Sequence, residues 1–254
     1  MKNILPILII AFAIIFSCQK KDDPTPANIT TAGATTSATA GTTAGGSAAT
    51  FNGACSNQKI YSITAGTTYS VANAQNTAVF TNALINNFNI PVGPFLNAGN
   101  LNLNNKLFKN SSYSYSDSTN ISAASPFIWS CTGASIPAFT VTNINPYATY
   151  ADYVYWPDTI KKSENFTISL TGSHNADEVQ ILIAKSGSTV SITYTALTSA
   201  GLVNISAGSL SPLSTLNTAV IQCNFYKNNI QTIGGSLINF RNVTSFVKTV
   251  PVKN

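Results

Sequence analysis

Alternating apolar and polar residues mark several short strands in the second half of the chain. Four segments carry apolar side chains at every second position with mostly polar ones between them: 166–170, 179–183, 190–194 and 219–225. A period of two residues is typical of strands with one buried face. Clusters of Gly, Ser, Asn and Pro, which favour turns, separate these segments. Short strands at this spacing predict an antiparallel sandwich, so we expect an immunoglobulin-like module over residues 149–254.

The pattern is less regular in residues 51–148, where we expect a second antiparallel β-sandwich module. Residues 101–108 predict a hairpin, because two asparagines separate two short runs and Asn tolerates the positive φ of a two-residue turn. Alternation also predicts strands at 127–131 and around Phe139 and Val141. Residues 77–88 fit a helix by spacing, but their Asn and Thr content favours a strand followed by a loop.

The N-terminus has a different pattern, an apolar run that is too short to cross a bilayer. Residues 4–16 are apolar, with one interruption at Pro6, and the small residue Ser17 precedes Cys18. A transmembrane helix needs about 20 apolar residues, whereas this layout is typical of a signal peptide. An uncleaved anchor helix and a buried core helix are the alternatives, and Pro6 argues against both. We predict a leader over residues 1–17 and lipid attachment to Cys18.

The residues around this cysteine resemble known lipoprotein signals. Residues 15–18 resemble the bacterial lipobox, although Phe16 stands where a small residue is more common, and Lys21, Asp22 and Asp23 resemble the surface-export signal of Bacteroidota lipoproteins. The resemblance implies several acyl chains on the cysteine, palmitate among them, and a position on the outer face of the outer membrane. A solvated charge cluster beside the lipid headgroups is the alternative for the three charged residues.

The order of motifs from residue 93 to the C-terminus resembles uncharacterised two-module lipoproteins of Bacteroidota. The shared features are an Asn- and Ser-rich hairpin, a strand with Trp129, a Phe-Thr-Val strand, and a tyrosine-rich connector before a sandwich. These motifs are structural. The resemblance therefore implies a location and a fold, and it implies no activity.

Residues 24–50 predict a flexible tether between the lipidated cysteine and the folded part. Thr, Ala, Gly and Ser dominate these 27 residues, and none of them is charged. A segment of this composition cannot bury enough apolar surface to offset the entropy lost on ordering. As a flexible coil it would span roughly 30 Å, enough to hold the folded part clear of the headgroups.

Composition favours a β-rich body and argues against nucleic-acid binding. Apolar residues make up 44% of the chain and charged residues 8%. Ser, Thr and Asn therefore supply most of the polar surface, and the scarcity of Glu and Lys favours strands over helices. From residue 51 onward, ten Lys and Arg stand against six Asp and Glu, with no basic cluster of the kind that follows phosphates. The length of this part fits one large β domain or two modules.

Three cysteines follow Cys18: Cys55, Cys131 and Cys223. An odd number leaves at least one thiol unpaired or paired between chains. Cys131 and Cys223 lie in alternating segments on the apolar face, so we expect them to be small core residues. If a bridge forms, Cys55 with Cys131 is the most plausible pair.

The sequence offers little catalytic chemistry. Its one histidine, His174, lies in a turn cluster, where a solvated side chain is the expected state. No nucleophile-elbow, phosphate-loop or dinucleotide-loop motif occurs. The pair Asp177 and Glu178 supplies few of the oxygen ligands that a calcium site needs. No grouping of His and Cys suits zinc. Two carboxylates flanking a cleft would be needed for a glycosidase, which leaves a hydrolase as a minor alternative. We expect no enzyme activity, no cofactor and no metal.

Two further groups of residues are candidates for surface chemistry. The connector residues Tyr153, Tyr155 and Trp156 would suit a sugar-stacking platform, but burial between the two modules is the favoured interpretation. Ser118 and Thr159 each follow an aspartate in a short motif that resembles the Bacteroidota O-glycosylation acceptor.

The sequence therefore predicts a cell-surface lipoprotein with a non-catalytic binding or envelope-structural role. Its partners would be the membrane, through the lipid anchor, and a glycan or protein ligand, with no role for nucleic acid. A glycan-binding accessory of a polysaccharide-uptake system is the alternative function.

Overall fold

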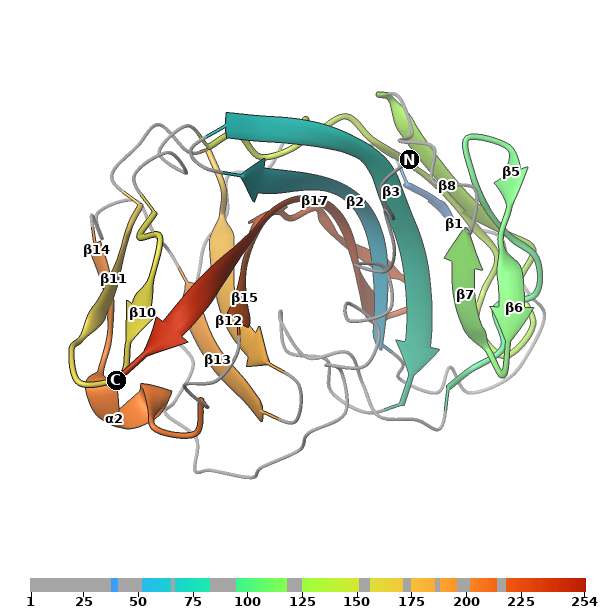
Figure 1. The fold of residues 1–254 in the computed structure, drawn as a ribbon. Helices are drawn as coiled ribbons and strands as arrows, with labels where there is room; N and C mark the ends of the chain where they lie inside the picture. The colour runs from blue at the N-terminus through green and yellow to red at the C-terminus, as the bar shows by residue number, and fades with distance from the viewer. Residues whose placement is uncertain are drawn as a thin grey trace, which may run out of the picture. The chain divides into compact units, whose positions relative to one another are not determined.

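The fold is built almost entirely of strands (Figure 1). The computed structural model describes residues 38–40, 52–64, 67–82, 95–117, 125–150, 156–170, 175–185, 188–195, 202–213 and 218–254. Residues Thr36–Asn254 form one compact unit. Among the described residues the α-helix is a single turn, α2 (Ala207–Leu210), which begins after Ser206, whose Oγ accepts a hydrogen bond from the Ser209 amide at 3.2 Å. The β-rich composition predicted from the sequence is confirmed.

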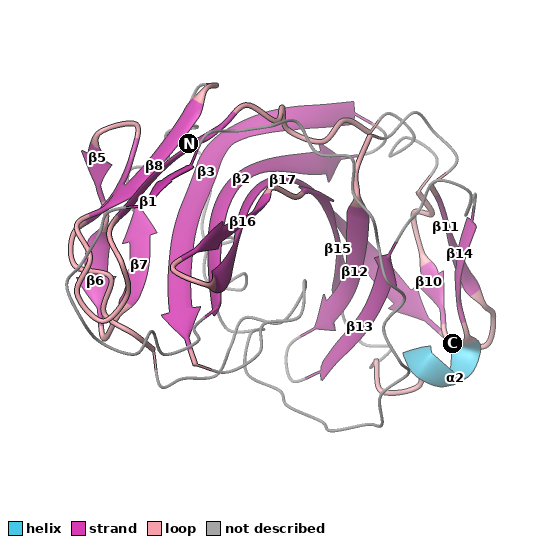
Figure 2. Cartoon of the chain, turned by 180° about the vertical axis from the view of Figure 1, so that it is seen from behind, coloured by secondary structure: helices cyan, strands magenta, loops and turns pink. Residues whose placement is uncertain are grey.

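A ten-stranded sheet, here called the main sheet, is the largest element (Figures 1 and 2). Two short strands, β10 (Ile160–Lys161) and β16 (Ile230–Ile233), pair with its longest strand, β17. The strands along its path are, in order, β13 (Ser188–Thr195), β12 (Glu178–Lys185), β15 (Thr218–Lys227), β17 (Ser236–Lys253), β2 (Asn52–Thr64), β3 (Thr67–Thr81), β7 (Ser114–Asp117) and β6 (Lys109–Ser111). Strands from both halves of the chain therefore share one sheet.

The main sheet is mixed, which corrects the expectation of purely antiparallel modules. β17 runs parallel to β2, with Leu237 opposite Asn52 and Lys248 opposite Ile63. β10 is also parallel to β17. A parallel pair needs a long connection, and here most of the chain separates β2 from β17. Hydrophobic alternation identifies a strand but carries no information about the direction of its neighbour.

Two smaller sheets accompany the main sheet. The second sheet has the order β1 (Ala38–Ala40), β9 (Phe139–Asn143), β8 (Phe127–Cys131), β4 (Leu101–Leu103) and β5 (Lys106–Leu107). The third pairs β11 (Phe166–Ser169) with β14 (Leu202–Ile205). The predicted hairpin is confirmed between β4 and β5, where Asn104 and Asn105 have φ values of 49° and 64°.

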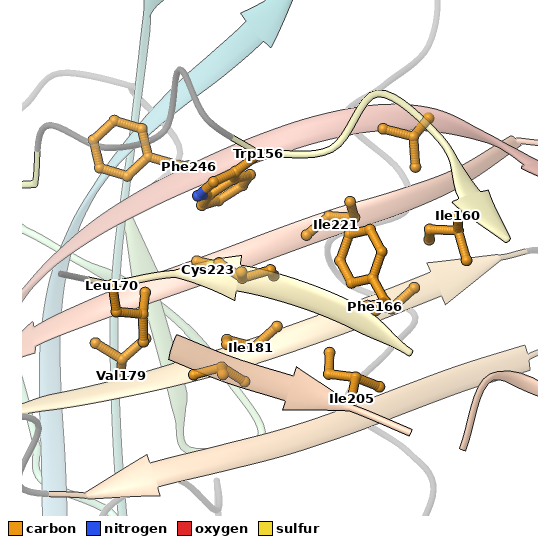
Figure 3. Close-up of a cluster of buried hydrophobic side chains, with 14 of the residues drawn as sticks. Trp156, Ile160, Phe166, Leu170, Val179, Ile181, Ile205, Ile221, Cys223 and Phe246 are labelled. Carbon is orange, nitrogen blue, oxygen red and sulfur yellow. The ribbon is translucent and has the colours of Figure 1, made fainter. Parts of the chain in front are cut away.

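Two apolar cores lie on the same face of the main sheet. The first core gathers the alternating residues of β11, β12 and β15 with the end of β17, and Figure 3 shows part of it. The second core joins β8, β9 and the hairpin to β2, β3 and the beginning of β17. β17 contributes Phe240 to the second core and Phe246 to the first. Each core contains residues from both sides of the predicted module boundary between residues 148 and 149, so neither core is formed by one predicted module alone. The boundary itself stays a prediction.

Hydrogen bonds hold the beginning of the tyrosine-rich connector, which follows β9, against the main sheet between the two cores. Asn242 donates through Nδ2 to the carbonyl oxygen of Asn145 at 2.6 Å, and Thr244 donates to that of Ala148 at 2.5 Å. Tyr147 donates its hydroxyl proton to Oδ1 of Asn57 at 2.6 Å. Polar side chains of β2 and β17 therefore replace the apolar contacts that a continuous core would have at this point.

A strand lies within the segment predicted to be a flexible tether. β1 pairs with β9 in antiparallel register, with Ala38 opposite Val141 and Ala40 opposite Phe139. The flexible tether as a whole stays a prediction, because the structure describes only Ala38–Ala40 of residues 24–50, and these three residues form a paired strand. The physical reason is the free edge of β9, whose backbone groups offer hydrogen bonds to any extended segment.

Candidate binding face on the main sheet

Most of the residues singled out from the sequence lie outside the described part of the chain. These are Cys18, Lys21, Asp22, Asp23, Ser118, Tyr153, Tyr155 and His174. Their roles stay predictions. Thr159 and Trp156 are described, and each has a definite environment.

Trp156 is a core residue and offers no exposed ring to a ligand, which corrects its role as a stacking platform. Its side chain is 2% exposed and lies among the apolar residues of the first core (Figure 3). Its indole Nε1 donates to the hydroxyl oxygen of Tyr150 at 2.8 Å, and that hydroxyl donates to the carbonyl oxygen of Ser169. The ring of Tyr150 in turn stacks on Phe225, with centroids 4.4 Å apart. Burial, the favoured interpretation of the connector residues, applies to Trp156.

The two predicted glycosylation motifs have aspartates in different environments. Asp117, before Ser118, is buried and pairs with Nζ of Lys106 at 3.0 Å. Asp158, before the half-buried Thr159, has a side chain that is 84% exposed. An enzyme acting on the folded protein would reach the second aspartate more easily.

Four of the five acids in the described part of the globular region form ion pairs with lysines. The pairs are Asp117 with Lys106, Asp158 with Lys248, Glu164 with Lys161, and Asp177 with Lys227. The fifth, Glu178, is buried in β12. Among the described residues, no group of three or more His, Cys, Asp or Glu could hold a metal ion.

The three cysteines of the globular part are buried free thiols. The bridge considered between Cys55 and Cys131 is not present, although both side chains lie in the second core. Burial raises the pKa of all three thiols, most strongly for Cys55 and Cys223. For Cys131 and Cys223, the expected role as small core residues matches this burial.

The face of the main sheet opposite the two cores carries a group of amides and hydroxyls among apolar residues such as Leu182, Val220 and Val243, and we call it the amide face. Because side chains alternate along a strand, one set of polar residues on β12, β15, β17 and β2 points away from the two cores. Register places them together, with Gln180 opposite Asn224 and Asn224 opposite Ser245. The members that form its hydrogen bonds are Ser56, Gln58, Gln180, Gln222, Asn224, Tyr226, Arg241 and Ser245.

A chain of hydrogen bonds crosses four strands of the amide face. Gln58 on β2 donates to Oγ of Ser245 at 2.6 Å, and Ser245 donates to Oδ1 of Asn224 at 2.6 Å. Asn224 donates through Nδ2 to Oε1 of Gln180 at 3.2 Å. Gln222 also donates to Oδ1 of Asn224, at 2.9 Å. Each amide therefore constrains the orientation of the next one.

Two charged groups of this face, Arg241 and Glu178, are buried. Arg241 is 7% exposed, donates to Oγ of Ser56 at 2.6 Å and lies 5.1 Å from the ring centroid of Tyr226. Burial raises the pKa of Tyr226, and nearby Glu178 acts in the same direction, whereas Arg241 lowers it without cancelling the rise. The phenol therefore stays protonated at neutral pH and donates to Oε1 of Gln180 at 3.0 Å.

Three half-buried glutamines each use one end of their amide group in this network. Nε2 of Gln58 and Nε2 of Gln222 are donors in it, whereas Oε1 of Gln180 accepts two hydrogen bonds. Among the described residues, the opposite ends of these three amides have no hydrogen-bond partner. The face therefore holds, in fixed orientations, two amide oxygens that can accept further hydrogen bonds and one amide NH2 group that can donate them.

The inner side of a bend carries the amide face. Figures 1 and 2 show β2, β3 and β17 curving along their lengths, with the second and third sheets outside the curve. The two cores lie between the main sheet and those outer sheets. The opposite face, with its amides, is therefore the concave one.

Sequence reasoning missed the amide face because its members are far apart in the chain. Gln58 and Ser245 are separated by 187 positions, and Ser56 and Arg241 by 185. A partial signal existed, since Gln180, Gln222 and Asn224 occupy the polar positions of alternating segments. That signal identifies an outward face but not which strands share it.

Comparison with known proteins identifies no family for this chain. A scan against protein-family models gives no match, and a search of curated proteins also gives none. Within the described residues, no helix has the length and hydropathy needed to cross a membrane.

Proposed function

We propose that the protein is a non-catalytic binding lipoprotein whose ligand contacts the amide face. The observation that carries this proposal is the network of amides on the concave side of the main sheet, with half-buried glutamines that each have one amide end without a hydrogen-bond partner among the described residues. A purely structural sheet face would have little need for oriented polar groups beyond those that satisfy one another. The ion pairing of most described acids also supports a non-catalytic role.

The anchor is the second part of the proposal. The leader over residues 1–17, Cys18 and the charged residues after it support a lipoprotein on the outer face of the outer membrane. Replacing Lys21, Asp22 and Asp23 with alanine should leave the protein lipidated but inaccessible to protease added to whole cells. Undiminished cleavage would reject the export role of these residues.

We also propose that each core belongs to a β-sandwich module, the C-terminal one immunoglobulin-like, with the main sheet common to both. The two separate cores support this interpretation, because each joins the main sheet to one of the smaller sheets. Hydrogen exchange would test it, since two modules predict two sets of amides with different opening free energies. One common opening free energy for both cores would favour a single domain.

Ligand-induced stabilisation tests the binding role. A ligand that binds the native state raises the melting temperature of the full-length lipidated protein in detergent. The probes are neutral polysaccharides, anionic polysaccharides and an unstructured peptide library. Stabilisation by any class, lost in Gln58→Ala and Gln222→Ala, supports binding through the amide face. If no class stabilises the protein, the binding role is rejected in favour of an envelope-structural one.

A further inference from the structure

We infer that the ligand of the amide face is an uncharged polysaccharide segment. This inference rests on the proposed function and names the class of ligand. The groups with unused hydrogen-bonding capacity are neutral: Oε1 of Gln58, Oε1 of Gln222 and Nε2 of Gln180. Sugar hydroxyls both donate and accept, so a single ligand type can satisfy the two acceptors and the amide donor.

Burial of Arg241 and Glu178 disfavours an anionic or cationic ligand on this face. Arg241 is 7% exposed and Glu178 is 6% exposed, so neither side chain presents its charge to a molecule on the surface. Arg241 is also engaged by Ser56 and by the ring of Tyr226. A charged ligand would lose hydration on this face without gaining an ion pair, whereas a neutral polar ligand exchanges water hydrogen bonds for amide ones.

The spacing of the three glutamines favours an extended ligand that crosses the strands. Gln180 lies on β12, Gln222 on the adjacent β15 and Gln58 on β2, which follows β17. Three strand spacings separate β12 from β2, a span of about 14 Å. This span fits several sugar units in a row, and a monosaccharide would reach one or two of the glutamines.

The network lowers the entropic cost of binding. Each glutamine is already held at one end of its amide by Ser245, Asn224 or Tyr226. A side chain that is ordered before binding loses less rotamer freedom when the ligand arrives. An extended peptide is the competing ligand, but peptides recognised by β-sheets pair with strand edges through their backbones, and the amide face presents side chains.

The decisive experiment compares polysaccharide binding by matched glutamine variants. Full-length lipidated protein in detergent is titrated with dextran, laminarin and yeast mannan as neutral probes, with polygalacturonate as the anionic one, and with an unstructured peptide library. Gln58→Ala and Gln222→Ala lie on different strands, so each serves if the other fails to fold. Gln231→Ala is the control, because Gln231 is also half-buried and donates to an asparagine two positions away. It lies opposite Ile238 of the second core, on the other face.

A neutral polysaccharide should bind the unmodified protein, and each face variant should weaken that binding about three- to tenfold, the value of one neutral hydrogen bond. The control should bind normally. Equal binding by Gln222→Ala, Gln58→Ala and the control would overturn the assignment to this face. Binding of polygalacturonate or a peptide, with no neutral probe bound, would overturn the ligand class and leave the binding role standing. Absence of every ligand would reject both.

Discussion

Lys248 on β17 contacts the connector at Trp156 and Asp158. Comparing Lys248→Met with Asp158→Asn separates the contribution of its hydrogen bond to stability from that of its ion pair. Its side chain is 5% exposed, and Nζ donates to the carbonyl oxygen of Trp156 at 2.6 Å. The same Nζ lies 2.7 Å from Oδ1 of Asp158, whose side chain is 84% exposed. Lys248→Met removes both interactions, whereas Asp158→Asn removes the ion pair and keeps the hydrogen bond to Trp156.

The two substitutions should differ in size because the two partners differ in exposure. A hydrogen bond from a charged donor contributes about 1.5–3 kcal/mol, and its loss leaves a carbonyl next to the first core without its donor. Methionine keeps the apolar stem and needs no desolvation of an ammonium group, which offsets part of the loss. We expect Lys248→Met to cost about 2 kcal/mol. Solvent screens the charge of the exposed Asp158, and in Asp158→Asn the Lys248 ammonium keeps its hydrogen bond to Trp156, so this variant should cost about 0.2–1 kcal/mol.

Urea and thermal unfolding of the full-length protein measure these differences. For a body of this size, 1 kcal/mol corresponds to about 2–4 °C in Tm. Lys248→Met should therefore lower Tm by about 4–8 °C, and Asp158→Asn by about 4 °C at most. Equal losses in the two variants would mean that the ion pair is the main contribution. An unchanged Tm in Lys248→Met would refute the role of Lys248 in holding the connector.

Other perturbations have equally definite outcomes. Gly53→Ala would place a Cβ 2.7 Å from Cδ1 of the fully buried Phe80, so it should cost about 1–3 kcal/mol in urea unfolding; an unchanged midpoint would show that the ring can move. Tyr226→Phe removes the hydroxyl that donates to Gln180 and should cost about 1 kcal/mol, and equal stability would contradict a role for that bond. A thiol reagent at pH 8 should react slowly with the native protein and quickly in urea. Rapid reaction of the native protein would contradict the burial of Cys55, Cys131 and Cys223. Because burial raises the pKa of these thiols, they keep their protons in the folded protein at a pH where they ionise in the unfolded chain. The stability should therefore fall as the pH rises above about 8.5. Cys18→Ser should abolish incorporation of labelled palmitate, and continued labelling would place the lipid elsewhere.

The strands β11, β12 and β15 were readable from the sequence because each one has an apolar core on one face, whereas β2 and β17 were not predicted. Val179, Ile181 and Ile183 are fully buried, as their alternation predicts. The turn at Asn104 and Asn105 was equally readable, since few residues other than glycine adopt positive φ at low cost. These are local properties, set by side-chain period and by the backbone preferences of single residues.

The burial of Trp156 could not be decided from the local sequence. An aromatic connector suits either a surface platform or a core, and the sequence pattern around it is the same in both cases. The structure decides for burial because Lys248, 92 positions away, holds the connector backbone against β17. The strand at Ala38–Ala40 is a similar case, since its partner is the free edge of β9 and its own composition favours a coil.

The sequence by itself determined the alternating strands β11, β12 and β15, their buried faces and the hairpin turn, and it predicts the leader and the lipid-attachment motif. The tertiary structure decided which strands are neighbours, and with that the parallel pairing of β2 with β17 and the amide face built across them. The physical reason is that strand pairing depends on backbone hydrogen bonds, which every residue other than proline can form, so the choice of partner comes from packing of the whole chain. Gln58, Asn224 and Ser245 become one network through that packing alone.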